Sequence, residues 1–439
     1  MYIKLHKVIN FSTVNFQSKR NIFNSPRIFS TLKTSTSIGE DIVIGNISYK
    51  KDNWTNVTAH LLSFVGKNIF LQKHHPLSLL RQRIVNFMYK RYVNRSKNPL
   101  FSVYDHLSPV VTLEQNFDSL LVPKDHVSRK ISDSYYINSK YMLRAHTSAH
   151  QRDLILSGLD NFLVIGDVYR RDEIDSSHYP VFHQIEGVRL LLPQDLFKNQ
   201  ENPDNLSLFE NGKRCSRKQE CHTLEATLLM EQELKNCLTD LAKDLFGNDI
   251  QYQWTESYFP FTHPSWELEI YHKDKWIEIL GCGIMEQKIL QNAGASEKIG
   301  WAFGLGLERL AMKLYSIPDI RLFWSTDSGF LSQFQVPFDT SVTYKPVSIF
   351  PQCTNDISFW IPNEFEPNDF FELVRSIGGD LVEQVYLIDE FYHKKKQQTS
   401  HCYRIVYRHM ERTLRQDEVN AVHHEIENQA EKLLNVVVR

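Results

Sequence analysis

The segment from Gly166 to Gly187, GDVYRRDEIDSSHYPVFHQIEG, constrains the fold of this chain more than any other part of it. In this segment Arg170 is followed by Asp172, a short polar loop, and then His178 and Phe182. Polar turn residues between two apolar stretches predict a hairpin of two strands. A guanidinium at the end of such a hairpin can bind a phosphate, and an aromatic ring can stack on a base. The spacing therefore indicates a nucleotide site on a sheet.

Two polar residues continue the side of the strand on which Phe182 is expected to lie. Gln184 and Glu186 follow it by two and four residues, and alternate residues of a strand point the same way. A carboxylate inside a sheet is costly unless it meets a cation. The α-ammonium group of an amino acid would be such a cation, and a structural ion pair with an arginine is the alternative.

A second polar row precedes the hairpin. In MLRAHTSAHQRD, the residues His146, Ser148 and His150 occupy alternate positions, so a strand would point all three to one side. Such a row could bind a charged head group. A metal site and a hydrogen-bonded polar edge are the alternatives.

An aromatic pair occurs in residues 258–285, which predict two strands joined by a turn at 272–275. Phe259 and Phe261 are expected to share one side, and rings packed in this way suit a phenyl side chain. Core packing is the alternative. Further along, GWAFGLGLERLAM (300–312) predicts a glycine-rich strand that leads into a helix, where Arg309 could reach a phosphate.

The remaining periodic segments predict helices and strands that serve packing. Apolar residues at helical spacing predict helices over 77–92 and 223–247, the second ending at Gly247, and a short strand is expected at 109–112. The polar, turn-rich stretch 193–222 predicts a surface insertion without chemistry.

The full chain has 42% hydrophobic and 23% charged residues, which is ordinary for a soluble protein, but its N-terminal segment differs from this average. Residues 1–39 contain no acidic residue, and their six basic residues are Lys4, Lys7, Lys19, Arg20, Arg27 and Lys33. This composition is typical of a mitochondrial transit peptide, and a disordered basic tail that binds RNA is the alternative. The sequence contains no run of about 18 apolar residues, so it predicts no membrane span. The six cysteines form no C-x-x-C pair, so we expect reduced thiols and no zinc site.

Three segments together resemble the class II aminoacyl-tRNA synthetases. Residues 166–187 resemble motif 2 of that family, 300–312 resemble motif 3, and 77–112 resemble motif 1. The F-P-F-T-H-P-S sequence from Phe259 resembles the phenylalanine pocket of phenylalanyl-tRNA synthetases. From about Lys73 to Arg439, the chain is similar to the single-chain mitochondrial form of that family. The resemblance implies an α+β fold: a catalytic domain with an antiparallel sheet flanked by helices, and a C-terminal ferredoxin-like domain that binds the anticodon.

The resemblance also implies which residues form the site. Arg170, Arg309 and Glu278 would be the catalytic residues, with Glu278 acting through a bound Mg²⁺. ATP would be bound by Arg170, Asp172, His178, Phe182, Glu278 and Arg309. The amino acid would be bound by His146, Ser148, Ala149, His150, Gln151, Arg170, Ser177, His178, Tyr179, Gln184, Ile185, Glu186, Phe259, Phe261, Glu278 and Phe303. Asp172 stands where many class II enzymes have glutamate, so its contact with adenine is the least secure of these assignments.

The C-terminal part predicts the order strand, helix, strand, strand, helix, strand, which is that of a ferredoxin-like fold. Residues 345–439 contain 11 Lys and Arg against 15 Asp and Glu, so any tRNA contact must be local. The candidates are Lys394, Lys395 and Lys396 in a loop, and Arg404 and Arg408 on one side of a strand, with Tyr403 and Tyr407 opposite. A solvated face is the alternative.

The expected organisation is a transit peptide at 1–35, a catalytic domain at 36–335, a linker at 336–345 and the anticodon-binding domain at 346–439. The implied activity is attachment of phenylalanine to tRNA(Phe) through a phenylalanyl-adenylate. It would use ATP with Mg²⁺, in the mitochondrial matrix, in a monomer. A non-catalytic tRNA-binding relative and a class II enzyme for another amino acid, such as serine or histidine, are the alternatives. Intact Arg170, Phe182, Glu186 and Arg309 argue against the first, and the Phe259/Phe261 pair against the second.

Overall fold

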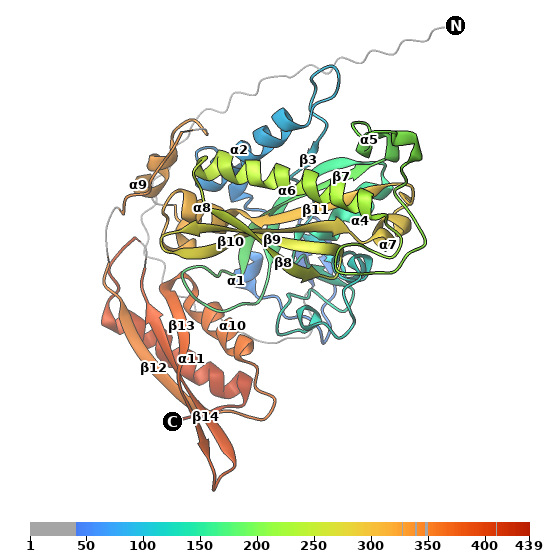
Figure 1. The fold of residues 1–439 in the computed structure, drawn as a ribbon. Coiled ribbons are helices and arrows are strands. Elements are labelled where there is room, and N and C mark those ends of the chain that lie inside the picture. The colour runs from blue at the N-terminus through green and yellow to red at the C-terminus, as the bar shows by residue number, and fades with distance from the viewer. Residues whose placement is uncertain (1–40, 327, 339, 347–349, 410) are drawn as a thin grey trace. The chain divides into compact units, whose positions relative to one another are not determined.

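A seven-stranded sheet is the framework of the larger, N-terminal part of the fold (Figure 1). The computed structural model describes residues 41–439 except 327, 339, 347–349 and 410, so the predicted transit peptide lies outside the described residues. In order across the sheet, the strands are β3 (Ser102–Tyr104), β6 (Asn161–Tyr169), β7 (Val181–Leu191), β11 (Ile299–Gly306), β10 (Lys275–Met285), β9 (Thr262–His272) and β8 (Tyr252–Phe259). All neighbours are antiparallel except β3 and β6, which are parallel. The predicted antiparallel sheet and its 272–275 turn are confirmed.

Three helices cover one face of this sheet: α2 (Pro76–Arg91), α6 (Leu224–Phe246) and α8 (Leu307–Leu314). Helix α2 begins where His75 accepts a hydrogen bond from the backbone N–H of Leu77, with Pro76 in the first turn. Helix α6 begins at the capping side chain of Thr223 and ends at Gly247, whose φ of 100° few other residues adopt. Both helices lie where the sequence predicts them.

The opposite face of the sheet carries a second, smaller core. Phe162 and Val164 of β6 and Val188 of β7 pack there, whereas Leu163 and Ile165 of β6 pack against the helical side. Strands β6 and β7 are therefore buried on both faces for most of their length, as β6 shows by its nearly continuous burial.

Short elements complete the catalytic part. They are the strands β1 (Ile42–Ile44), β2 (Ile47–Tyr49), β4 (Val110–Thr112) and β5 (Tyr141–Leu143), and the helices α1 (Ala59–Leu62), α3 (Leu113–Asn116), α4 (Gln151–Leu156), α5 (Pro193–Leu196), α7 (Gln287–Asn292) and α9 (Ser328–Leu331). Short 3₁₀ helices are η1 (Ile69–Leu71), η2 (Asp118–Leu120), η3 (Val127–Arg129), η4 (Thr147–His150), η5 (Pro203–Asn205), η6 (Ile320–Trp324) and η7 (Ser332–Phe334).

The predicted surface insertion at 193–222 is largely exposed, but its last residues are not. Gln219 and His222 are buried, and the Gln219 side-chain amide donates to the carbonyls of His263 and Met285, both at 2.9 Å. The prediction of a surface segment is therefore wrong for its C-terminal end, which is anchored against β9 and β10.

The C-terminal part is a four-stranded antiparallel sheet in the order β13–β14–β12–β15, packed against two helices. Its elements are β12 (Cys353–Trp360), α10 (Pro367–Gly378), η8 (Gly379–Leu381), β13 (Val382–His393), β14 (Gln398–Tyr407), α11 (Gln416–Leu434) and β15 (Val437–Val438). This order is the ferredoxin-like arrangement, and the predicted α+β fold is confirmed. Within the described ranges, every helix is too short or too polar to cross a membrane.

Candidate active site

The hairpin of β6 and β7 brings together the residues of motif 2 that are predicted to bind a nucleotide. Arg170 follows the end of β6, and its Nε donates to the carbonyl of Ala145 at 2.7 Å. Its guanidinium lies over the ring of Phe182, 5.2 Å from the ring centre. Burial lowers the pKa of Arg170, and repulsion from Arg309 acts in the same direction. A cation held close to an aromatic ring and a second cation is suited to an anionic ligand.

Glu186 is the buried acid of this site. Its carboxylate is 3% exposed and accepts hydrogen bonds from Ser148 and Gln151, and from Thr147 at 3.3 Å. Burial raises the pKa of Glu186 to about 7, and the hydrogen bonds act in the opposite direction. Among the described residues it has donors but no ion-pair partner, so the alternative of a structural pair with arginine is wrong. A cation from outside the chain would complete its surroundings.

The row His146, Ser148 and His150 does not form as expected. Residues 147–150 form the 3₁₀ helix η4, and His146 precedes it, so the alternation of a strand does not apply. Ser148 reaches Glu186, whereas the Nε2 atom of His150 lies 2.9 Å from Arg144. The His146 ring lies 6.3 Å from that of Phe261, and burial lowers its pKa to about 3, so it is neutral.

Several other predicted residues are buried in packing contacts. The Ile185 side chain is fully buried on the helical side of the sheet, and Ala149 is buried in the smaller core. The hydroxyl of Tyr179 donates to Asp380 at 2.7 Å, and its ring stacks on Trp324. Their side chains, like that of His150, are therefore not brought to the site.

The loop of motif 2 holds a compact polar group. Ser177 donates to Asp175 at 2.9 Å, and the Nδ1 atom of His178 lies 2.8 Å from the same carboxylate. The hydrogen bond to Asp175 raises the pKa of His178. Glu173, Asp175 and His178 offer ligand atoms within 4.8 Å of one another. In addition, Ile174 packs in the core of the C-terminal domain, and the Asp172 carbonyl accepts from Arg375 at 2.7 Å.

The aromatic pair is stacked. Phe259 ends β8 and Phe261 lies in the turn before β9, yet their rings are 5.9 Å apart and inclined by 13°. Gly281 makes room for the pair, because a Cβ on it would lie 2.8 Å from Phe259. The prediction that Phe303 lines the same pocket is wrong: its ring is 2% exposed and packs in the core on the helical side of the sheet, where a Cβ on Gly187 would lie 2.3 Å from it. The predicted face-sharing is confirmed, although Phe261 is outside the strand.

Motif 3 runs from β11 into α8, as predicted. The Arg309 guanidinium pairs with Glu278 on β10 at 3.0 Å, and both side chains are about half exposed, at 49% and 43%. A carboxylate oxygen in this position has the chemistry that Mg²⁺ prefers, and phosphate and water oxygens would supply the other ligands. Glu278 therefore fits the predicted metal role.

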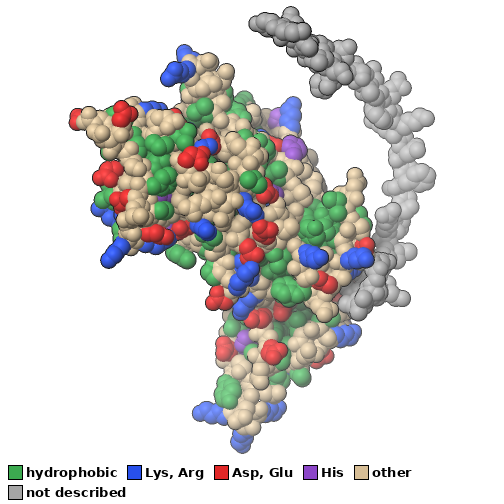
Figure 2. Space-filling model, turned by 90° about the vertical axis from the view of Figure 1, so that its right-hand side faces the viewer, with side chains coloured by type: hydrophobic (Ala, Val, Ile, Leu, Met, Phe, Trp, Pro, Cys, Tyr) green, Lys and Arg blue, Asp and Glu red, His purple; other side chains and the backbone are tan. Residues whose placement is uncertain are grey.

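The C-terminal candidates divide into two groups. Lys394, Lys395 and Lys396 are exposed between β13 and β14, and Figure 2 shows Lys and Arg side chains gathered at the end of this hairpin. Lys396 lies over the ring of Trp360 at 5.2 Å. By contrast, Arg404 binds Asp356 through two hydrogen bonds of 2.7 Å, and Arg408 binds Glu383 at 2.6 Å. Tyr403 and Tyr407 lie on the opposite side, buried in the domain core.

Sequence reasoning missed some residues of the site. Thr147 donates to Glu186, and Gly281 leaves space for Phe259. Thr147 could have been noticed as a hydroxyl between two predicted residues. Gly281 gives no signal in a single sequence, because its importance depends on what packs against it.

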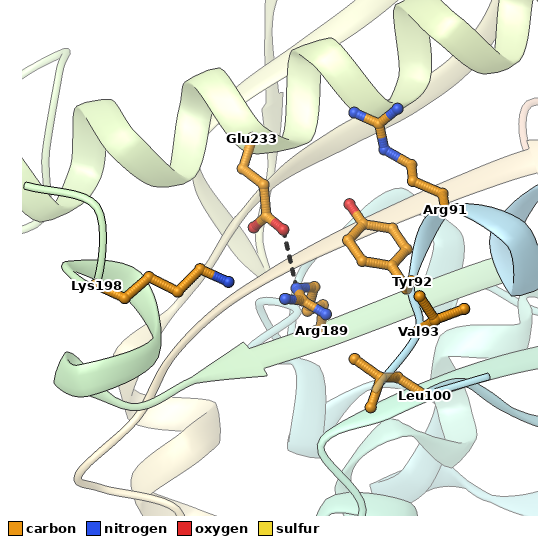
Figure 3. A pocket seen from close by; sticks show the side chains of 7 residues that line it. All are labelled: Arg91, Tyr92, Val93, Leu100, Arg189, Lys198 and Glu233. Carbon is orange, nitrogen blue, oxygen red and sulfur yellow. Dashed lines mark ion pairs between the residues drawn. The ribbon is translucent and has the colours of Figure 1, made fainter. Parts of the chain in front are cut away.

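A cavity of about 470 Å³ lies elsewhere (Figure 3). It is lined by Arg91, Tyr92, Val93, Leu100, Arg189, Lys198 and Glu233. Arg91 ends α2, and Tyr92, Val93 and Leu100 belong to the segment after it; Arg189 lies on β7, Lys198 follows α5 and Glu233 lies on α6. None of these is a predicted site residue.

Comparisons with known proteins match both parts of the fold. The family model of the class II tRNA synthetase core domain (F) matches residues 56–191 and 218–334, and that of the ferredoxin-fold anticodon binding domain matches 348–439. A probable mitochondrial phenylalanine–tRNA ligase of Drosophila melanogaster is 54% identical over 97% of this chain and 99% of its own length. The mitochondrial phenylalanine–tRNA ligase of Mus musculus is 57% identical over 89% of this chain and 87% of its own. That of Saccharomyces cerevisiae is 38% identical over 90% and 93%.

Proposed function

The chain belongs to the mitochondrial phenylalanine–tRNA ligases of the class II aminoacyl-tRNA synthetase family, and on this premise we propose how its residues charge tRNA(Phe) with phenylalanine. It is an ATP-dependent ligase of mitochondrial translation. The observation that best supports the substrate assignment is the combination of a buried acid without an ion-pair partner, Glu186, and the stacked pair Phe259 and Phe261.

Phenylalanine would be held at its two ends. Glu186, oriented by Ser148, Gln151 and Thr147, accepts the α-ammonium group, and the stacked rings receive the phenyl side chain. The ammonium group of phenylalanine offsets the free-energy cost of burying the ionised Glu186 carboxylate. Binding of the amino acid therefore also neutralises this charge.

ATP would be held by residues of two motifs. Arg170 binds the α-phosphate and Phe182 stacks on adenine, while Arg309 binds the outer phosphates. Mg²⁺, bound with the help of Glu278, would neutralise phosphate charge. In this assignment Asp172, Ser177 and His178 belong to the loop that closes the nucleotide side of the site.

The reaction needs no nucleophilic side chain. In the first step, a carboxylate oxygen of phenylalanine bonds to the α-phosphorus as the bond to pyrophosphate breaks. In the second step, the 2′-hydroxyl of the terminal ribose attacks the carbonyl carbon, and AMP leaves. The protein's contribution is orientation and stabilisation of developing negative charge by the two arginines.

The tRNA would contact the C-terminal domain at Lys394, Lys395 and Lys396, where exposed ammonium groups can bind phosphates. Arg404 and Arg408 are already neutralised by Asp356 and Glu383, so we assign them smaller contributions. One chain carries the catalytic and the anticodon-binding fold, which supports activity as a monomer, and the basic residues 1–35 support import into the mitochondrial matrix.

Amino-acid-dependent exchange between ATP and pyrophosphate, measured with the full chain and without tRNA, tests this proposal. We expect exchange with phenylalanine and weak exchange with tyrosine, because an apolar pocket rejects an added hydroxyl by only about a hundredfold. Exchange driven by a different amino acid would overturn the substrate assignment. No exchange by a folded protein that binds tRNA would show a non-catalytic tRNA-binding protein instead.

A further inference from the structure

Motifs 2 and 3 are joined by a buried contact that the assigned binding roles do not use. Glu308, the residue before Arg309, is 2% exposed, and its carboxylate accepts two hydrogen bonds from His183. One comes from the backbone N–H at 2.8 Å, and the other joins Nδ1 of the imidazole ring to the carboxylate at 2.6 Å. The two residues are 125 positions apart in the chain.

The backbone hydrogen bond from His183 to Glu308 takes the place of a hydrogen bond in the strand ladder. The ladder between β7 and β11 ends at the pair Gln184 and Gly306, and the chain then turns into α8. The N–H of His183, one residue beyond this pair, consequently has no strand carbonyl on that side. A buried N–H without an acceptor is costly, and Glu308 supplies the acceptor from the first turn of the helix.

The ring of His183 is fixed by its neighbours as well as by Glu308. It packs 5.1 Å from Phe70 and 5.8 Å from Trp324, and His183 has no measurable exposure. Because the space around the ring is filled, the two hydrogen bonds define one arrangement of α8 against β7.

The ligand-binding residues lie directly beside this contact. Phe182 and Gln184 flank His183 in the chain and lie on the other side of the strand, and Arg309 follows Glu308. The adenine platform and the arginine for the outer phosphates thus belong to different elements, and this contact links one to the other.

We propose that Glu308 and His183 are positioning residues for ATP. Resting on the proposed function, this inference assigns them the task of setting the separation between Phe182 and Arg309. Arg309 itself is half exposed, and its guanidinium pairs with Glu278. This exposed contact restrains Arg309 less than the buried contact of Glu308 restrains the turn from β11 into α8. An error of about 1 Å in such a separation is enough to slow a reaction by up to a hundredfold.

Two pairs of variants of the full chain test the proposal by pyrophosphate exchange. Glu308→Ala removes the acceptor, whereas Glu308→Gln keeps an oxygen for the backbone N–H. His183→Ala removes the ring, whereas His183→Asn can place a donor near the position of Nδ1. We expect both alanine variants to raise KM for ATP about tenfold or more and to lower kcat. KM for phenylalanine should change about threefold at most, and the Gln and Asn variants should recover most of the loss.

Glu233→Ala is the matched control. Glu233 lies on α6 and pairs with Arg189, which shares its side of β7 with His183, and it accepts from Trp301 of β11 at 2.9 Å (Figure 3). Its loss should lower the melting temperature and leave KM for ATP unchanged.

If wild-type protein shows no exchange, the proposed function fails before this test begins. If it does, two results would overturn the positioning role: equal effects of Glu308→Ala on KM for ATP and for phenylalanine, or an effect of Glu233→Ala on KM for ATP as large as that of Glu308→Ala. Should Glu308→Ala not fold, the two His183 variants decide by the same criteria.

Discussion

At the scale of single residues, the proposed binding of phenylalanine depends on the surroundings of Glu186. Its carboxylate is held by three donors in a buried position, and its pKa is raised to about 7. An ordinary glutamate on the surface would be ionised at every physiological pH and would be fully hydrated. In the proposed function, a buried carboxylate such as this one needs a positively charged ligand to be ionised, which would favour an ammonium group.

The raised pKa predicts how phenylalanine binding responds to pH. Below about pH 7 the carboxyl group is protonated and cannot pair with the ammonium, so KM for phenylalanine should rise about tenfold for each further unit of acidity. Above pH 7 the group is ionised, and KM should level off. Exchange assays at saturating ATP between pH 5.5 and 8.5 measure this, with Glu186→Gln as the control that should lack the inflection. A KM for phenylalanine that does not change across this range would contradict the assignment.

At the scale of elements, the strands of the sheet depend on glycines whose neighbours are large. Gly281 of β10 faces the ring of Phe259, whereas Gly304 of β11 faces open space, with no atom within 4 Å of a Cβ built on it. The same residue type therefore serves close packing in one strand and leaves space in the next.

This difference gives a paired prediction. Gly281→Ala should destabilise the protein by about 1–3 kcal/mol, because its Cβ would lie 2.8 Å from Phe259 and the ring must move. Gly304→Ala should leave the free energy of unfolding nearly unchanged. Denaturant unfolding of both variants measures the effect, and equal losses of stability would show that the packing around Gly281 is looser than we describe.

At the scale of the whole molecule, a buried network joins the catalytic and C-terminal parts. Tyr135 donates to Glu372 at 2.6 Å, and Arg375 pairs with Glu372 at 2.9 Å while donating to the carbonyl of Asp172 at 2.7 Å. Asp172, the acidic residue of motif 2, is thus held through its backbone carbonyl by Arg375 of the anticodon-binding domain.

Arg375→Ala should lower the free energy of unfolding by about 3–5 kcal/mol, because it leaves the buried carboxylate of Glu372 without its cation. Arg404→Ala, which removes an exposed pair with Asp356 in the same domain, should have little effect on unfolding. Denaturant titrations monitored by tryptophan fluorescence compare the two variants. Equal, small effects would mean that the network contributes specificity of docking rather than stability.

Recognition of tRNA is predicted to depend on the hairpin tip. Replacing Lys394, Lys395 and Lys396 by glutamine should weaken tRNA binding and reduce the slope of log affinity against log salt by about 2–3. Filter binding at several salt concentrations measures both quantities, and the melting temperature checks the fold. An unchanged salt slope would exclude phosphate contacts at these lysines. Arg404→Ala should change the slope less, because its charge is already paired.

Much of the fold follows from local pattern. The helices at 76–91 and 224–246 have apolar stripes and end signals that can be interpreted without any long-range contact. The strands β6, β7 and β11 overlap the predicted motif segments. Prediction failed where regular periodicity did not apply. Residues 147–150 form a 3₁₀ turn rather than a strand, which sends His150 to Arg144 and leaves Ser148 with Glu186.

The sequence by itself determined the long helices, the motif-bearing strands and the resemblance to the family, because each depends on residues close together in the chain. Only the tertiary structure decided which side chains reach the site. It turned Ile185 and Tyr179 away from it, and it placed Glu308 against His183. Such contacts arise where separate elements pack, and their geometry depends on the register and filled volume of the whole sheet, which no local spacing encodes.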